Sequence, residues 1–265
     1  MSSMNKAENV KEQYKDDKNL VTRIKLHVEY STNKQGFFPW LFEKYEFLYG
    51  YRILELGCGN GEQWNNRIQQ LPEDCLLVLS DISDGLVKNV WERYSKYNNF
   101  LAQKVDISNI QFPDNSFDVV IANHMLYHVP DIPKAISEVK RVLKNDGKFY
   151  TSTNGKGGLR EYLHNAFRAV NPSSTAFTQN YSFNLQNGAE ILREHFKDVK
   201  RFDYEDSLRI TDTNDLIEWL KSTISIATYC EKDIEGLYDY FEEIRLKEGA
   251  INIPKEAGLF ICTSI

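Results

Sequence analysis

Short runs of apolar residues alternate with helical patterns along most of this chain. Apolar runs of five or six residues are typical of strands that are covered on both faces, as in a parallel sheet. The runs that predict strands are 52–56, 75–80, 100–105, 117–122, 147–152, 199–204 and 258–263.

The clearest helical pattern lies between the fourth and fifth predicted strands. Apolar residues recur there at helical spacing from Ile132 to Leu143. Asp131 is placed to cap the first turn, and Pro133 fits that turn because its missing N–H would be unbonded anyway. Gly147 follows the last turn, where a positive φ is often needed. Strand and helix in repeated alternation predict a doubly wound α/β sheet.

The other segments depart from this alternation. Residues 1–48 precede the first strand and look helical, with Leu20, Ile24 and Val28 four residues apart. Two later stretches carry helical patterns and interrupt the sheet. We therefore expect an N-terminal helical lid and a sheet domain with two cap insertions. The expected bounds are 1–48 for the lid, 49–265 for the domain, and about 154–196 and 213–250 for the insertions.

Composition excludes several classes of protein. The chain has 265 residues, 42% of them hydrophobic, and a formal net charge of −6. An acidic chain without a dense basic run argues against a general affinity for nucleic acid or for an anionic membrane. No stretch approaches the roughly 20 apolar residues that a membrane helix needs.

The N-terminus and the cysteines predict a cytoplasmic location. No apolar run follows Met1–Lys6, so we expect no secretory signal. No two of the four cysteines lie close enough for a CxxC pair, so neither a zinc site nor a redox motif is indicated. We interpret them as reduced thiols: Cys58, Cys75, Cys230 and Cys262.

The sharpest motif is a glycine-rich turn that follows the first predicted strand. Gly57, Gly59 and Gly61 alternate there, and glycine allows backbone angles and close approaches that a Cβ would block. A dinucleotide fingerprint needs a glycine where this chain has Glu62. The phosphate-loop lysine is absent as well. The turn therefore predicts a ligand without a bound pyrophosphate.

The second motif is Asp81, at the end of the second predicted strand and 24 residues after Gly57. A carboxylate at this place in a doubly wound sheet can accept hydrogen bonds from both hydroxyls of a ribose. The alternative is a surface aspartate that caps the next helix. The glycine turn and the acid together are more specific than either alone.

The order and spacing of five motifs resemble class I S-adenosylmethionine-dependent methyltransferases of the small-molecule branch. The resemblance covers roughly residues 50–155. It rests on the segments 55–61, 79–83, 105–107, 112–129 and 141–147.

The resemblance implies a Rossmann-like methyltransferase fold, S-adenosylmethionine as cofactor, and methyl transfer to nitrogen or oxygen of a small-molecule acceptor. It implies that Asp81 holds the ribose and that Asp106 with Ile107 holds the adenine. In similar enzymes an N-terminal lid pairs an arginine with the cofactor carboxylate and brings a tyrosine near the sulfonium methyl. The implied cofactor-binding residues are Tyr14, Arg23, Glu55, Gly57, Cys58, Gly59, Gly61, Asp81, Ile82, Asp106, Ile107 and Asn123.

His128 is the candidate general base, because the region after the fourth strand faces cofactor and acceptor in the family. The alternative is a structural histidine that is hydrogen-bonded near the cofactor. His27, His164 and His195 are interpreted as structural. An ordinary amphipathic helix with a solvated Arg23 is likewise an alternative to the lid.

Several substrate classes lack their sequence signals. The proline-rich fourth motif of amino-group nucleic-acid methyltransferases is absent, and so is the Pro-Cys nucleophile of the cytosine-carbon type. Asp131 is the only acid close after the fourth strand, so we expect no metal. Two alternatives to methyl transfer stay open. One is other transfer chemistry, such as aminopropyl transfer, and the other is a non-catalytic binding role.

Overall fold

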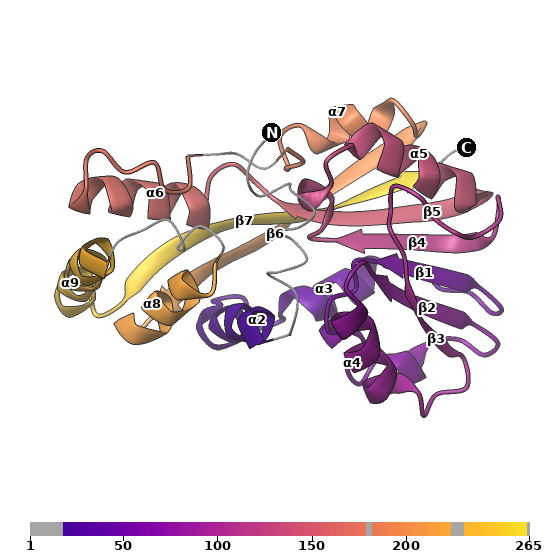
Figure 1. Ribbon diagram of the computed structural model, residues 1–265, viewed down its shortest axis with the longest axis horizontal. Coiled ribbons are helices and arrows are strands. Elements are labelled where there is room, and N and C mark those ends of the chain that lie inside the picture. The colour runs from indigo at the N-terminus through magenta and orange to yellow at the C-terminus, as the bar shows by residue number, and fades with distance from the viewer. Residues whose placement is uncertain (1–17, 179–181, 224–230, 264–265) are drawn as a thin grey trace.

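Seven strands form one sheet across residues 18–178, 182–223 and 231–263, which the computed structural model describes (Figure 1). Their order is β3-β2-β1-β4-β5-β7-β6. β7 runs antiparallel to β5 and β6, while the pairs from β3 to β5 are parallel. The predicted doubly wound, mostly parallel sheet is therefore confirmed. The strands are β1 (Arg52–Leu56), β2 (Leu76–Asp81), β3 (Phe100–Lys104), β4 (Phe117–Asn123), β5 (Leu143–Asn154), β6 (Asp198–Ile210) and β7 (Ile251–Thr263).

Both faces of the sheet are covered, which explains the continuous apolar runs. Ile53 and Leu54 are neighbours in β1 and point to opposite faces, yet both are fully buried. One face packs against α5 (Ile132–Val142) and α7 (Gly188–Arg193). The other packs against α3 (Phe37–Lys44) and α4 (Asp84–Tyr94).

The start of α5 is as predicted, but its end is not. The Asp131 carboxylate accepts a hydrogen bond from the Lys134 N–H at 3.0 Å, and Pro133 lies in the first turn. α5 ends at Val142 and β5 begins directly, so Gly147 lies inside a strand and has no positive φ. The expectation of a helix-ending glycine was wrong. A Cβ at Gly147 would lie 2.9 Å from the Asp118 carbonyl oxygen, so a close backbone approach explains the glycine.

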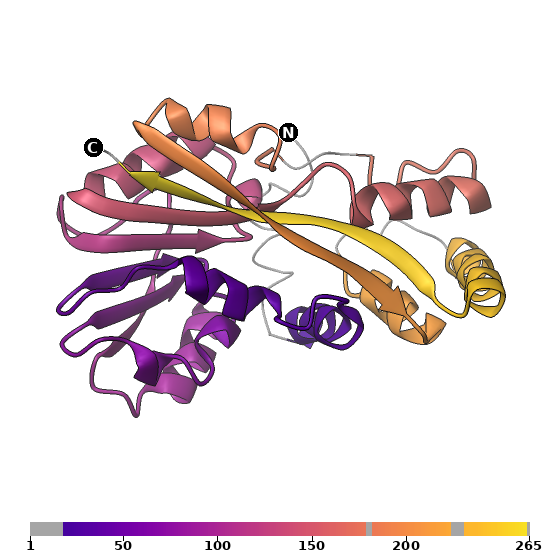
Figure 2. The same cartoon turned by 180° about the vertical axis from the view of Figure 1, so that it is seen from behind.

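β6 and β7 extend far beyond the rest of the sheet, as Figure 2 shows. Each has 13 residues, and their pairing continues past the last β5 contact, Asn154 with Ala257. Three helices pack on this extension and form a separate apolar core with it. They are α6 (Leu159–Val170), α8 (Thr213–Lys221) and α9 (Glu231–Glu248).

The N-terminal helix α2 (Lys18–Tyr30) contacts α8 and β6. Leu26 and Tyr30 form its buried side, whereas Val28 is 75% exposed. The predicted helix is therefore present, but Val28 of the expected apolar stripe faces outward. Residues 31–36 connect α2 to α3. Among the described helices, none combines the length and the apolar character needed to cross a membrane.

Candidate cofactor and acceptor site

The glycine turn leaves the carboxyl end of β1 in a conformation that excludes side chains. Gly57, Gly59 and Gly61 have φ values of 70°, 58° and 73°. A Cβ at Gly57 would lie 3.0 Å from the Met125 side chain, and one at Gly61 would lie 2.8 Å from the Tyr94 ring. The backbone angles therefore favour glycine at all three positions, and the limited space adds to this at Gly57 and Gly61.

Asp81 lies beside this turn and is held by backbone groups. Its carboxylate accepts hydrogen bonds from the Gly59 N–H at 3.1 Å and from the Ser83 N–H at 2.9 Å, one on each oxygen. Burial raises the pKa of Asp81, and the backbone hydrogen bonds oppose that rise. Each oxygen keeps a second lone pair, so the carboxylate can still accept two hydroxyl donors. This arrangement fits a vicinal diol such as that of a ribose.

Three further residues predicted to bind the cofactor lie just after the ends of two neighbouring strands, β2 and β3. Asp106 follows β3, is exposed, and accepts a hydrogen bond from the Ser108 N–H at 2.8 Å. Ile107 is buried, and Ile82 is half-buried next to Asp81. Carboxyl ends of parallel strands form the usual ligand crevice of such sheets. The adenine contacts of Asp106 and Ile107, and the cofactor contact of Ile82, stay predictions.

Glu55 is buried at the end of β1 and accepts a hydrogen bond from the Trp64 indole N–H at 2.5 Å. Burial raises the pKa of Glu55 to about 8, so this carboxyl is mostly protonated at neutral pH. Trp64 belongs to the turn η2 (Glu62–Trp64), which follows the glycines. Cys58 is half-buried within the glycine turn, and burial raises the pKa of its thiol well above the ordinary range.

Asn123, at the end of β4, joins the sheet to the N-terminal segment. Its amide nitrogen donates to the Tyr45 hydroxyl at 2.7 Å and to the Gln63 side-chain oxygen at 2.8 Å. Sequence reasoning missed Tyr45, Gln63 and Trp64. For Gln63 and Trp64 the available signal is their position directly after the glycine turn, but Tyr45 has no local motif.

Two histidines follow β4, and one of them has an unusual backbone. His124 has φ = 49°, which is rare for a non-glycine residue, and its N–H donates to the Ser152 carbonyl at 2.9 Å. His128 ends the turn η4 (Leu126–His128). Burial lowers the pKa of both side chains to about 4, so both imidazoles are neutral at pH 7.

His27 on α2 belongs to the same electrostatic group, although sequence reasoning interpreted it as structural. Burial and the charge of Lys255 lower its pKa to about 3, and His124 contributes to the shift. Arg23 lies one turn earlier on α2, and its positive charge contributes to the lowered pKa of His128. Tyr14 lies outside the described residues. The structure thus brings α2 to the end of β4, and the roles predicted for Arg23 and His128 stay predictions.

The side chains described here include no group of three or more histidines, cysteines or carboxylates that could hold a metal ion. His164 has a local partner, since its Nδ1 lies 2.8 Å from the Ala176 carbonyl oxygen.

Comparison with known proteins finds similarity to methyltransferases over part of the chain. Residues 54–151 match the family model of a methyltransferase domain. A malonyl-[acyl-carrier protein] O-methyltransferase of Paenibacillus sp. is 28% identical over 45% of this chain and 44% of its own length. The chain spans about half the length, or less, of the first curated relatives that it matches.

Two solved structures share the fold. The YcgJ protein of Bacillus subtilis has a TM-score of 0.58 and 18% identity, over 86% of this chain and 98% of that one. Phosphoethanolamine N-methyltransferase 2 of Haemonchus contortus, solved with S-adenosyl-L-methionine, has a TM-score of 0.62 and 18% identity, over 100% of this chain and 60% of that one. Residues 54–151 are therefore similar to a methyltransferase domain, and the chain shares the fold of these two solved structures.

Proposed function

We propose that this chain binds S-adenosylmethionine and transfers its methyl group to a small-molecule acceptor. The observation that carries the proposal is the pairing of Asp81 with the glycine turn. A buried carboxylate, held by the Gly59 and Ser83 N–H groups, keeps two acceptor positions beside a backbone that a side chain would obstruct. When bound, the cofactor supplies an electrophilic methyl group on a positively charged sulfur.

The remaining cofactor contacts are part of the same proposal. Asp81 binds the ribose hydroxyls, while Ile82, Asp106 and Ile107 flank the adenine. The amino-acid end lies over the glycine turn. Its neighbours there are Glu55, Cys58, Gly57, Gly59, Gly61, Asn123 and Arg23.

His128 is the proposed general base for an acceptor that must lose a proton. Its imidazole is neutral at pH 7, because burial lowers its pKa to about 4, so it can accept a proton. An acceptor that is already deprotonated needs no base, since alignment of the reacting atoms lowers the barrier.

α2 is the proposed lid. A groove of about 320 Å³ separates α2 from the segment after the glycine turn, and its lining includes Ile24, Val28 and Glu62. A helix at this place would exclude water from the reacting atoms on closing. Residues 18–30 should then gain protection from hydrogen exchange when the cofactor is added, and equal exchange with and without it would make α2 a fixed scaffold.

Incubation with methyl-labelled S-adenosylmethionine and a metabolite extract tests the proposed activity. A labelled methyl product, made by the wild type and lost in Asp81→Ala, is expected. Asp84→Ala is the matched control, because the Asp84 side chain is 78% exposed at the start of α4. A different labelled product, or none, would refute methyl transfer.

A further inference from the structure

A set of buried and half-buried polar side chains lies where α2 and the β6–β7 extension meet the end of β4. We call His27, His124, Trp219, Asp206 and Lys255 the junction cluster. The His27 and Trp219 rings meet edge to face at 6.3 Å, and the charges of Lys255 and Asp206 act on His27. The charge of Lys255 also acts on His124. Four elements therefore bring these residues together: α2, the end of β4, α8 and the β6–β7 pair.

Asp206 and Lys255 form a buried ion pair in this cluster. They are opposite residues in the β6–β7 register, and their side chains are 0% and 12% exposed. The Lys255 ammonium donates to one Asp206 oxygen. Two buried charges are costly to remove from water, so such a pair needs further hydrogen bonds to be stable.

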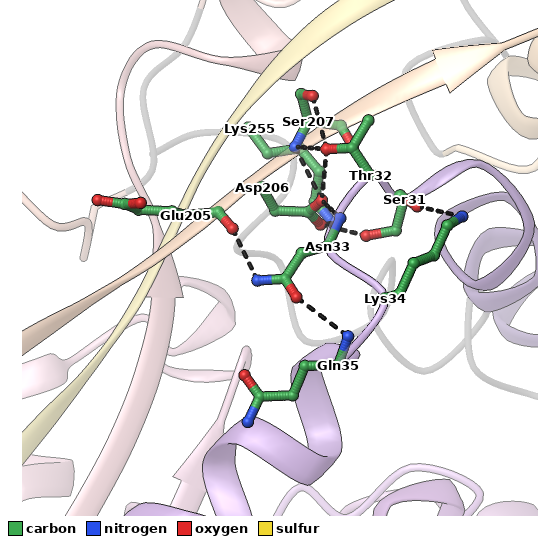
Figure 3. A network of polar contacts seen from close by, with 9 residues as sticks. All are labelled: Ser31, Thr32, Asn33, Lys34, Gln35, Glu205, Asp206, Ser207 and Lys255. Atoms are coloured by element: carbon green, nitrogen blue, oxygen red, sulfur yellow. Dashed lines mark hydrogen bonds and ion pairs between the residues drawn. The ribbon is translucent and has the colours of Figure 1, made fainter.

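The Asp206 carboxylate receives those hydrogen bonds from the segment that joins α2 to α3 (Figure 3). The Ser31 hydroxyl donates to it at 2.5 Å and the Asn33 N–H at 3.0 Å. The Ser207 N–H donates at 2.8 Å, and the Thr32 hydroxyl lies at 3.4 Å. With the ammonium of Lys255, these donors occupy the lone pairs of the carboxylate. Asp206 therefore has no capacity left for a cation from outside.

The charges that act on the histidines are mostly positive. The positive charge of Lys255 lowers the pKa values of His27 and His124, and that of Arg23 lowers the pKa of His128. Asp206 is the opposing charge on His27, and it is already paired. The histidines are neutral at pH 7. An ammonium group at this place would therefore meet the ammonium of Lys255 and an Asp206 carboxylate whose lone pairs are already occupied.

Two buried polar atoms of the cluster have no hydrogen-bond partner among the described residues. They are the Trp219 indole nitrogen and Nδ1 of His27. Trp219 is only 8% exposed, and an indole N–H can donate but not accept. Buried polar groups are almost always paired in native proteins, so these atoms point to a ligand. The indole N–H requires an acceptor atom, such as an oxygen.

We infer that the methyl acceptor presents a carboxylate to the junction cluster, and that Lys255, held by Asp206, sets this preference. The inference rests on the proposed function, because it names the acceptor class of that site. Asp206 is a positioning residue here: it holds Lys255 on one side and the α2–α3 connection on the other. The ammonium of Lys255 and the indole N–H of Trp219 both favour an anionic oxygen, whereas an ammonium group would face the charge of Lys255 without an unpaired carboxylate in the cluster.

The test compares three ligands of matched shape and different charge: phenylacetate, phenylacetamide and 2-phenylethylamine. Binding is measured by calorimetry at pH 7 with and without saturating S-adenosylhomocysteine. Phenylacetate should bind at least tenfold more tightly than either of the others. Equal affinities, tighter binding of the amine, or no binding by any of the three would overturn the inference.

Two double variants show whether the ion pair causes the preference. Asp206→Asn with Lys255→Gln removes both charges while leaving polar side chains of similar size, and it should reduce the preference to less than threefold. Asp198→Asn with Lys200→Gln is the matched control, because that pair lies exposed at the other end of β6. If the first variant still binds phenylacetate tenfold more tightly than the other two ligands, Lys255 does not cause the preference for a carboxylate.

The two proposals fail in different ways. Absence of S-adenosylhomocysteine binding would refute the proposed function. The preference for phenylacetate is also measured without S-adenosylhomocysteine, so it can be tested independently. Cofactor binding without the charge preference would refute the carboxylate inference alone.

Discussion

Replacing Asp206 by alanine should destabilise the protein strongly. The substitution removes the partner of Lys255, whose side chain is only 12% exposed, and leaves its ammonium buried and uncompensated. It also removes the acceptor for the Ser31 hydroxyl and the Asn33 N–H, which anchor the α2–α3 connection. Breaking a buried ion pair from one side typically costs about 3–5 kcal/mol of unfolding free energy. We expect Asp206→Ala to fall in that range.

Urea unfolding at pH 7, followed by circular dichroism, measures this loss. The double variant Asp206→Asn, Lys255→Gln should lose less than Asp206→Ala, because no buried charge is left alone. The single variants Asp206→Asn and Lys255→Gln should show a coupling of about 1–3 kcal/mol in a double-mutant cycle. A loss below about 1 kcal/mol for Asp206→Ala, or additive single variants, would show that the pair is effectively solvated and would refute the reasoning.

Three further predictions concern the glycine turn, the histidines and metal dependence. Gly57→Ala should lower the unfolding free energy by about 1–2 kcal/mol, because an L-residue is strained at positive φ. It should also weaken cofactor binding, measured by calorimetry. Unchanged binding would show that the glycine turn does not contact the cofactor. Stability should fall from pH 7 to pH 5, since the unfolded chain takes up protons near pH 6.5 while His124 and His128, with pKa values of about 4 in the folded protein, do not. His124→Gln should reduce this fall by about 2 kcal/mol in urea unfolding, and an unaltered pH dependence would contradict the assigned burial. Methyl transfer should persist in excess chelator, and activity restored only by magnesium would contradict it.

The sheet could be predicted from the sequence because both of its faces are buried. Continuous apolar runs then mark each strand, as in β1 and β4. The extension of β6 and β7 could not be predicted, because Asp206 and Lys255 interrupt the apolar pattern there. Only the structure shows that these two charges neutralise each other across the strands.

The cofactor side of the site was visible in local motifs, since the glycine turn and Asp81 lie at fixed places relative to two strands. The junction cluster has no such motif. His27, His124 and Lys255 are far apart in the sequence, and they meet only because the β6–β7 extension and α2 reach the end of β4. Tyr45 could not be predicted either, because its hydrogen bond with Asn123 depends on how α3 packs on the sheet.

The role of Asp81 is tested by the affinity for S-adenosylmethionine of the wild type, Asp81→Ala and the exposed control Asp84→Ala. The wild type and the control should bind alike, while Asp81→Ala should bind at least tenfold more weakly. Loss of a charge-assisted hydrogen bond, about 1.5–3 kcal/mol, corresponds to a factor of ten or more. Equal affinity of all three proteins, or no binding by the wild type, would contradict the account.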